Sequence, residues 1–102
     1  METFSQTMSA LSDTTRVQIL AFIQKHGELC VCDIENSFDM IQSRISRHLK
    51  ILKDAGFLTV ERRGRWAYYD LPSSLDNLRQ SALHEIASLD LNLPKLQKGC
   101  KI

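Results

Sequence analysis

The apolar residues between positions 41 and 71 change their period once, and this change constrains the fold more than any other feature. Ile45, Leu49 and Leu52 recur at i, i+4 and i+7, which is typical of the buried face of a helix. Gly56 suits the end of that helix, and after it the apolar residues alternate in two short runs. A glycine-containing basic stretch separates the two runs, so the segment predicts a helix followed by a β-hairpin.

The same spacing and the capping residues predict further helices on both sides of this segment. Ser12 and Asp13 are N-cap types, Gly27 suits the left-handed position after a helix, and Asp39 is a candidate N-cap for the helix that follows it. The fold class is mainly α with a β-hairpin wing, a winged helix-turn-helix. The predicted helices are one through Phe4, Met8 and Leu11, then about Thr14–His26, Leu29–Asn36, Ile41–Ala55 and Leu75–Leu89.

A chain of 102 residues has room for one small domain. We assign residues 1–91 to a DNA-binding and dimerisation domain and residues 92–102 to a flexible C-terminal tail. The last predicted helix has heptad-like apolar spacing, which fits either a dimer interface or packing on its own domain. No apolar run is long enough to span a membrane and no signal peptide is visible, so a cytoplasmic location is expected.

The basic residues are concentrated in one segment of a nearly neutral chain. The net charge is +1, yet positions 42–65 contain seven Lys and Arg residues against two acidic ones. Uncompensated positive charge on a helix-turn-helix and its wing favours DNA binding over a merely solvated face. His48 flanks the buried stripe and is expected to form a half-buried hydrogen bond. The predicted DNA-binding residues are Gln42, Ser43, Arg44, Ser46, Arg47, Lys50, Arg62, Arg63 and Arg65.

Cys30 and Cys32 form the second candidate site, a metal-binding pair. Thiolates select soft metals and metalloids, although small buried cysteines also serve as ordinary packing residues. On an intact helix two side chains two residues apart point roughly 200° away from each other. We therefore expect that one ion bound by both sulfurs distorts the helix that carries them. Cys100, the third cysteine, is a possible third metal ligand or an idle surface thiol.

Four stretches of this sequence resemble the ArsR/SmtB family of metal-sensing winged-helix repressors. The resemblance implies a homodimer joined through the first and last helices, which binds operator DNA without metal and leaves it when metal binds. Glu28-Leu29-Cys30-Val31-Cys32-Asp33 is similar to the signature of the arsenical and cadmium/lead sensors. The matching stretches are Ala10–Arg16, Glu28–Ile34, Ser46–Leu52 and Ala55–Leu58.

Departures from the family pattern narrow the range of metals and metalloids expected to act as the inducer. Glu35 stands where arsenic sensors with this signature usually carry a third cysteine, and no cysteine precedes Cys30, unlike in the cadmium/lead sensors. Trivalent arsenic fits best, and a methylated arsenical also fits two helical thiols. The expected inducer is As(III) or Sb(III), and no obligatory cofactor is expected. The sequence therefore predicts an arsenical-resistance repressor. The alternatives are a thiol redox-sensing repressor or a cadmium/lead sensor, and a thiol enzyme is disfavoured because no anion-cradling loop follows either cysteine.

Overall fold

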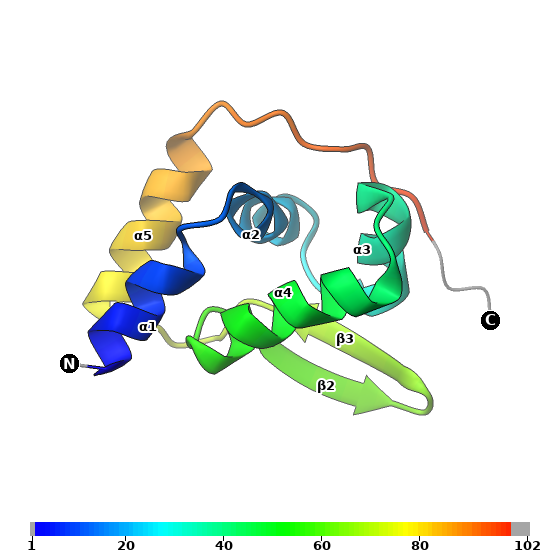
Figure 1. The fold of residues 1–102 in the computed structure, drawn as a ribbon, viewed down its shortest axis with the longest axis horizontal. Helices are drawn as coiled ribbons and strands as arrows, with labels where there is room; N and C mark the ends of the chain where they lie inside the picture. Colours follow the sequence, from blue (N-terminus) through cyan, green and yellow to red (C-terminus); the bar gives the residue numbers. More distant parts are fainter. Residues whose placement is uncertain (1, 99–102) are drawn as a thin grey trace.

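The computed structural model describes residues 2–98 and contains a winged helix-turn-helix, as predicted (Figure 1). Within these residues lie five helices and one three-stranded sheet. The elements in chain order are α1 (Glu2–Ala10), α2 (Thr14–His26), β1 (Leu29–Cys30), α3 (Val31–Phe38), α4 (Gln42–Asp54), β2 (Thr59–Arg63), β3 (Trp66–Asp70) and α5 (Asn77–Ser88).

The limits of α2 follow from the caps that the sequence indicated. The Asp13 carboxylate accepts the backbone N–H of Arg16 over 3.2 Å, which satisfies one of the donors left open in a first helical turn. At the other end Gly27 has φ = 83°, and its N–H donates to the Ile23 carbonyl. The buried residues of α2 are the consecutive positions Ile19–Ile23, and the helix packs against both α4 and α5.

The cap predicted for α4 is wrong. Asp39 has φ = 54° and ends α3 in a left-handed conformation, whereas Ile41 is the N-cap of α4 and forms no side-chain cap hydrogen bond. Asp39 tolerates the left-handed region because its short polar side chain can bond locally. The predicted stripe is confirmed, since Ile45, Leu49 and Leu52 are all fully buried.

The sheet contains the predicted hairpin and one strand that the sequence pattern did not indicate. β2 pairs with β3 in antiparallel register from Thr59 opposite Asp70 to Arg63 opposite Trp66. The short strand β1 adds to the other side of β3 and pairs Cys30 with Tyr68, which gives the order β1-β3-β2. The wing is therefore hydrogen-bonded directly to the segment just before α3.

Helices α1 and α5 lie next to each other at one end of the molecule (Figure 1). Arg79 of α5 joins the two helices, because its Nη2 donates to the Thr7 hydroxyl of α1 over 3.0 Å. Its Nε donates to the carbonyl of Ala55, just after α4, over 2.8 Å. The same guanidinium packs against Gly56, where an added Cβ would lie 2.6 Å from Arg79 Nε. Gly56 is thus required both by its φ of 87° and by this contact.

Residues 91–98, here called the C-terminal strap, run across α2 toward α3 (Figure 1). The sequence placed most of them in a flexible tail. They form no helix or strand, yet Leu91, Leu93 and Leu96 pack against the core. Among the described residues, no helix has both the length and the apolar character needed to cross a bilayer.

Candidate nucleic-acid interface and cysteine site

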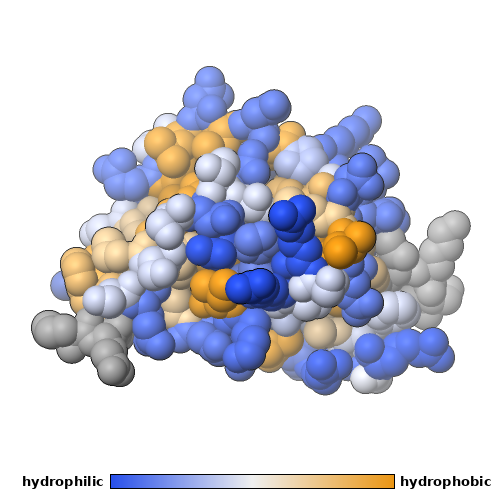
Figure 2. Space-filling view, viewed as in Figure 1, coloured by the Kyte–Doolittle hydropathy of each residue, from blue (hydrophilic) through white to orange (hydrophobic). Residues whose placement is uncertain are grey.

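The outer face of α4 presents the polar residues that were predicted to contact DNA. Burial of the apolar stripe turns these side chains outward, and Figure 2 shows strongly hydrophilic residues gathered over the middle of this face. Lys50 forms a 2.8 Å ion pair with Asp54 one turn later, so part of its charge is already compensated. The exposed residues of this face are Gln42, Ser43, Arg44, Ser46, Arg47 and Lys50.

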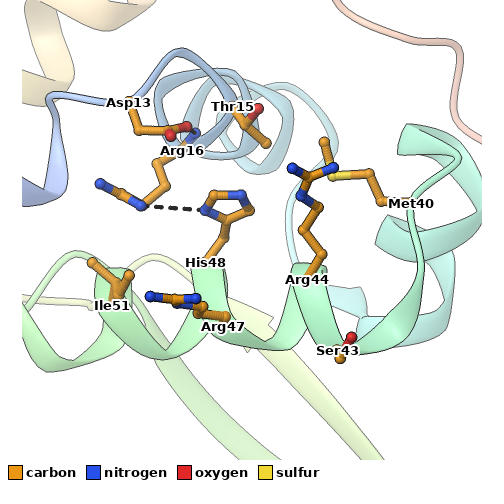
Figure 3. Close-up of a pocket in the computed structure, with 9 residues that line it drawn as sticks. All are labelled: Asp13, Thr15, Arg16, Met40, Ser43, Arg44, Arg47, His48 and Ile51. Carbon is orange, nitrogen blue, oxygen red and sulfur yellow. Dashed lines mark hydrogen bonds between the residues drawn. The ribbon is translucent and has the colours of Figure 1, made fainter.

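A groove of about 850 Å³ separates the start of α2 from α4, and three arginines line it (Figure 3). Arg44 reaches from α4 toward α2, Arg16 lines the groove from α2, and Arg47 lies along α4 at its edge. Among the described residues of the lining, Asp13 is the one carboxylate, so the groove is cationic. Such a groove suits a phosphate group beside a recognition helix.

Arg16 is a residue of this groove that the sequence pattern did not single out as functional. Its Nε donates to the Ala10 carbonyl over 2.8 Å and its Nη2 to the Ser9 carbonyl over 3.3 Å. Its Nη1 lies 3.3 Å from His48 Nδ1, which therefore accepts from the guanidinium (Figure 3). Arg16 thus joins the end of α1 to the middle of α4. Only the resemblance of Ala10–Arg16 to a known family pattern marked this position.

His48 has the half-buried, hydrogen-bonded environment that the sequence predicted. Burial lowers its pKa below the usual 6.5, Asp13 opposes the shift, and the positive charges of Arg16, Arg44 and Arg47 add to it. Burial acts against ionisation of Asp13, but the backbone N–H and the guanidinium of Arg16 hold the pKa of Asp13 below its usual value. The ring at this position is therefore kept neutral while the carboxylate stays charged.

The three arginines of the wing are all exposed, but they differ in their partners. Arg63 Nη2 lies 2.8 Å from a carboxylate oxygen of Glu28 and equally close to one of Glu61, and its guanidinium lies over the Tyr68 ring. Arg62 and Arg65 have no carboxylate within ion-pair distance in the described part of the chain. Arg63 therefore ties the wing to the segment before β1, whereas its two neighbours present uncompensated charge.

The position of the cysteine pair corrects a prediction made from helix geometry. The helix begins at Val31, not at Leu29, and Cys30 is its extended N-cap with ψ = 148°. The Sγ atoms of Cys30 and Cys32 consequently lie 2.7 Å apart instead of on opposite sides of a helix. Both sulfurs can reach one atom while α3 stays intact, so the expected distortion of the helix is not a geometric requirement.

The neighbourhood of the pair combines a buried and a partly accessible sulfur. Cys30 is 1% exposed and Cys32 is half-buried. Glu35, three residues after Cys32, is also half-buried, and burial raises its pKa. Residues 2–98 contain no group of three His, Cys, Asp or Glu side chains arranged to hold a metal ion. Cys100, the predicted third ligand, lies outside the described residues.

Comparison with known proteins gives the class of this fold. The reduced form of HlyU from Vibrio cholerae superimposes with a TM-score of 0.72 over 89% of this chain and 92% of that one. Its sequence identity is 21%, so the likeness concerns the fold. Together with the hairpin wing, the likeness shows that this is a winged-helix fold.

Sequence relatives then give the family. Residues 13–60 match the family described as "Bacterial regulatory protein, arsR family". The arsenic resistance transcriptional regulator ArsR2 of Pseudomonas putida is 37% identical over 91 residues, which cover 89% of this chain and 76% of that protein. The chain belongs to the arsR family of bacterial regulatory proteins.

Other relatives in the family differ in the metal that their names give. The arsenical resistance operon repressor of Bacillus subtilis is 44% identical over 67% of this chain and 65% of that protein. A cadmium resistance regulatory protein, a CadC homolog of Staphylococcus aureus, is 39% identical over 66% of this chain and 55% of its own length. The chain thus spans between about half and two thirds of the length of several relatives.

Proposed function

We propose that the chain is a cytoplasmic transcriptional repressor that binds operator DNA as a homodimer and leaves it when arsenite or antimonite binds Cys30 and Cys32. The observation that carries this proposal is the place of the pair. Its two sulfurs lie 2.7 Å apart at the junction of β1 and α3. β1 is hydrogen-bonded to the wing and α3 packs against α4, so the junction adjoins both elements that carry the DNA-binding residues.

On the DNA side, the start of α4 supplies base contacts and the groove supplies phosphate contacts. Gln42, Ser43 and Arg44 occupy the first turn of α4, the end of a recognition helix that meets base edges. Arg47 and Arg16 line the cationic groove and would hold a backbone phosphate. The exposed wing residues Arg62 and Arg65 would contact the neighbouring groove.

On the ligand side, a metalloid bonded to both sulfurs fixes the angle between β1 and α3. Thiolates are the ligands that soft metalloids prefer, and Cys30 and Cys32 bring two sulfurs within 2.7 Å of each other. An inducer shifts a protein only as far as it binds one conformation better than the other. We infer that the angle set by the bound metalloid differs from the angle in the DNA-bound form, so that the wing and α4 no longer fit the duplex together.

The proposed homodimer interface is the surface formed by α1 and α5 at one end of the molecule. Phe4 is 54% exposed and Met8, one turn later on the same face of α1, is 38% exposed. Leu89 at the end of α5 is 50% exposed. Large exposed apolar side chains on two adjacent helices mark an association surface. Sedimentation of the purified chain would test this, and a monomer at micromolar concentration would contradict the dimer.

Fluorescence anisotropy of a labelled duplex tests the whole proposal. The duplex is selected with the protein from a random-sequence library, which avoids assuming an operator. Arsenite and cadmium chloride are then added to the complex in separate titrations. We expect tight binding without metal and complete release by about one equivalent of arsenite per chain. Persistent binding at saturating arsenite would rule out the inducer, and release by cadmium alone would assign the pair to that metal.

A second candidate, a thiol redox sensor, is favoured by the same sulfur–sulfur contact. On an intact helix the two thiols would point roughly 200° apart, but Cys30 precedes the helix and its sulfur contacts that of Cys32. Oxidation of the pair by peroxide would also fix the angle between β1 and α3. Release of the duplex by peroxide in the absence of arsenite, reversed by dithiothreitol, would support the redox sensor. Release by arsenite under reducing conditions would support the metalloid sensor.

A further inference from the structure

Ile41, the residue just before α4, has the most exposed of the large apolar side chains in the described part of the chain. It is 72% exposed, whereas Ile45, one turn later, is fully buried. Met40, the residue before it, is partly buried and packs against the core. The backbone is extended at Ile41, so these two neighbouring side chains point to opposite sides. Ile41 is therefore turned away from the core.

The Ile41 side chain does not stabilise the end of α4 either. Ile41 is the N-cap of this helix, but its side chain forms no cap hydrogen bond. Its backbone carbonyl accepts from the N–H groups of Arg44 and Ile45, over 3.1 and 3.2 Å. Ser, Thr, Asp and Asn are preferred at an N-cap, and isoleucine is among the poorest residues there. Neither packing nor capping therefore accounts for an isoleucine at this position.

Ile41 is also separate from the surface assigned to the homodimer. The other large apolar side chains that are exposed within residues 2–98 are Phe4 and Met8 on α1 and Leu89 at the end of α5. Helices α1 and α5 lie at one end of the molecule, and the start of α4 lies beside α3 toward the other end (Figure 1). The exposed side chain of Ile41 therefore fits a different partner.

The residues that follow Ile41 indicate what this partner is. Gln42, Ser43 and Arg44 are exposed in the first turn of α4, at the end of a recognition helix that meets base edges. Gln and Arg form bidentate hydrogen bonds with the polar edges of adenine and guanine. The apolar group that a base presents in the major groove is the 5-methyl group of thymine. An exposed isoleucine beside these polar side chains matches that group.

We propose that Ile41 contacts the 5-methyl group of a thymine in the operator and so helps to determine which DNA sequence is bound. Ile41 adds a base contact to the DNA interface described above, so the inference rests on the proposed function. Contact removes both apolar groups from water, which favours an A·T pair at that place without using charge. The β-branched side chain has a restricted χ1 angle, so little rotational freedom is lost when it is buried.

Replacing thymine by deoxyuridine removes only the 5-methyl group, so a double-substitution cycle measures the contact. Each thymine of the duplex selected from the random-sequence library is replaced in turn, and binding is followed by anisotropy. At one thymine we expect binding of the unaltered protein to weaken about 3- to 5-fold, the factor for one buried methyl group. Ile41→Ala should bind the thymine and deoxyuridine forms of that duplex equally. Equal effects of every replacement on both proteins, or no effect on either, would overturn the proposal.

Three further variants separate recognition of the methyl group from a change in the fold. Ile41→Val keeps a branched apolar side chain and should keep most of the preference for thymine. Ile41→Ser adds a capping hydroxyl, so its melting temperature should equal or exceed that of the unaltered protein while the preference disappears. Arg47→Ala is the matched control and should weaken binding of both duplexes by the same factor. A preference that survives in Ile41→Ser, or is lost in Arg47→Ala, would overturn the proposal.

Selection from the random-sequence library distinguishes failure of this proposal from failure of the proposed function. If the unaltered protein selects no duplex, DNA binding fails and the role of Ile41 fails with it. If a duplex is selected and released by arsenite, but no thymine methyl group is recognised through Ile41, only the role of Ile41 fails. A second selection with Ile41→Ala should yield duplexes without enrichment of thymine at the identified position. Continued enrichment there would contradict the proposal.

Discussion

Two regions differ in how they hold their functional side chains: the exposed face of α4, which carries Arg44 and Arg47, and the junction of β1 and α3, which carries Cys30 and Cys32. On α4 the polar side chains project from one uninterrupted helix, with a buried stripe behind them. At the junction Cys30 ends a strand and Cys32 lies in the first turn of a helix, and Cys30 is almost wholly buried. A change on the face should therefore alter DNA affinity alone. A change at the junction should be felt by the two elements that meet there.

The largest effect should come from removing the two groove arginines of α4 together. Arg44→Ala with Arg47→Ala should weaken duplex binding about 30-fold or more, because each arginine contact to DNA contributes about 1–3 kcal/mol. The melting temperature should change little, since both side chains are exposed. Lys50→Ala is the matched control. Its loss should be smaller because Lys50 is paired with Asp54. If the double variant is unfolded enough at the assay temperature to explain the lost binding, the claim that the α4 face affects DNA affinity alone would be contradicted.

Arg16 contacts α4 from α2, and its replacement should lower both the DNA affinity and the stability of the fold. Arg16→Met removes the hydrogen bonds to Ser9, Ala10 and His48, so we expect about 10-fold weaker duplex binding and a lower melting temperature. Arg16→Lys keeps the charge but not the planar arrangement of donors. Anisotropy and thermal denaturation of both variants would separate the two roles. Full duplex affinity in Arg16→Lys would show that only the charge is used.

Two arginines of the wing should differ in their effects, because Arg63 contacts Glu28 just before the cysteine pair and Arg62 does not. Arg62→Ala should weaken duplex binding several-fold, while Arg63→Ala should weaken it less, because Glu28 and Glu61 already offset the charge of Arg63. Arg63→Ala should instead reduce the effect of arsenite on duplex affinity, since it removes a link between the wing and the segment before Cys30. An unchanged arsenite effect in Arg63→Ala would remove the wing from the path of the signal.

The smallest expected effect is the pH dependence of stability that His48 contributes. The folded chain holds the pKa of His48 below its ordinary value of 6.5. The unfolded chain therefore binds a proton first as the pH falls. The contribution to the free energy of unfolding is fully present above about pH 6.5 and is lost as the pH falls through the folded pKa. Urea denaturation between about pH 7.5 and 5.5 should show a smaller decline for His48→Gln than for the unaltered protein. Parallel declines would exclude His48 as the cause.

The contrast between face and junction also explains how far the sequence could predict the site. The stripe Ile45, Leu49 and Leu52 is a property of one regular helix, so its periodicity alone predicts that Arg44 and Arg47 point outward. The relation of Cys30 to Cys32 depends on which residue begins α3. That start is set by the pairing of β1 with β3, a contact between Cys30 and Tyr68, which lie far apart in the chain. A two-residue strand leaves no periodic pattern, so local spacing could not reveal it.

The packing of the C-terminal strap and the contacts of Arg16 could not be predicted from the sequence for a related reason. Leu91, Leu93 and Leu96 lie in a segment with Pro94, which is a weak signal for any regular element. Their packing is decided by the core surface beneath them, which near Leu91 and Leu93 is formed by α2 and α5. Likewise Arg16 reaches His48 across 32 positions of sequence. Asp39 failed as a helix N-cap because Asp serves equally well as a left-handed residue at the end of the preceding helix.

The most direct test of the account is the affinity of arsenite measured twice by calorimetry, for the free protein and for its complex with the duplex. If the sulfurs at the junction and the face of α4 share one conformational equilibrium, each ligand must weaken the other by the same factor. We predict weaker arsenite binding in the complex, by the factor with which arsenite weakens duplex binding. Equal arsenite affinities with and without the duplex would contradict the account.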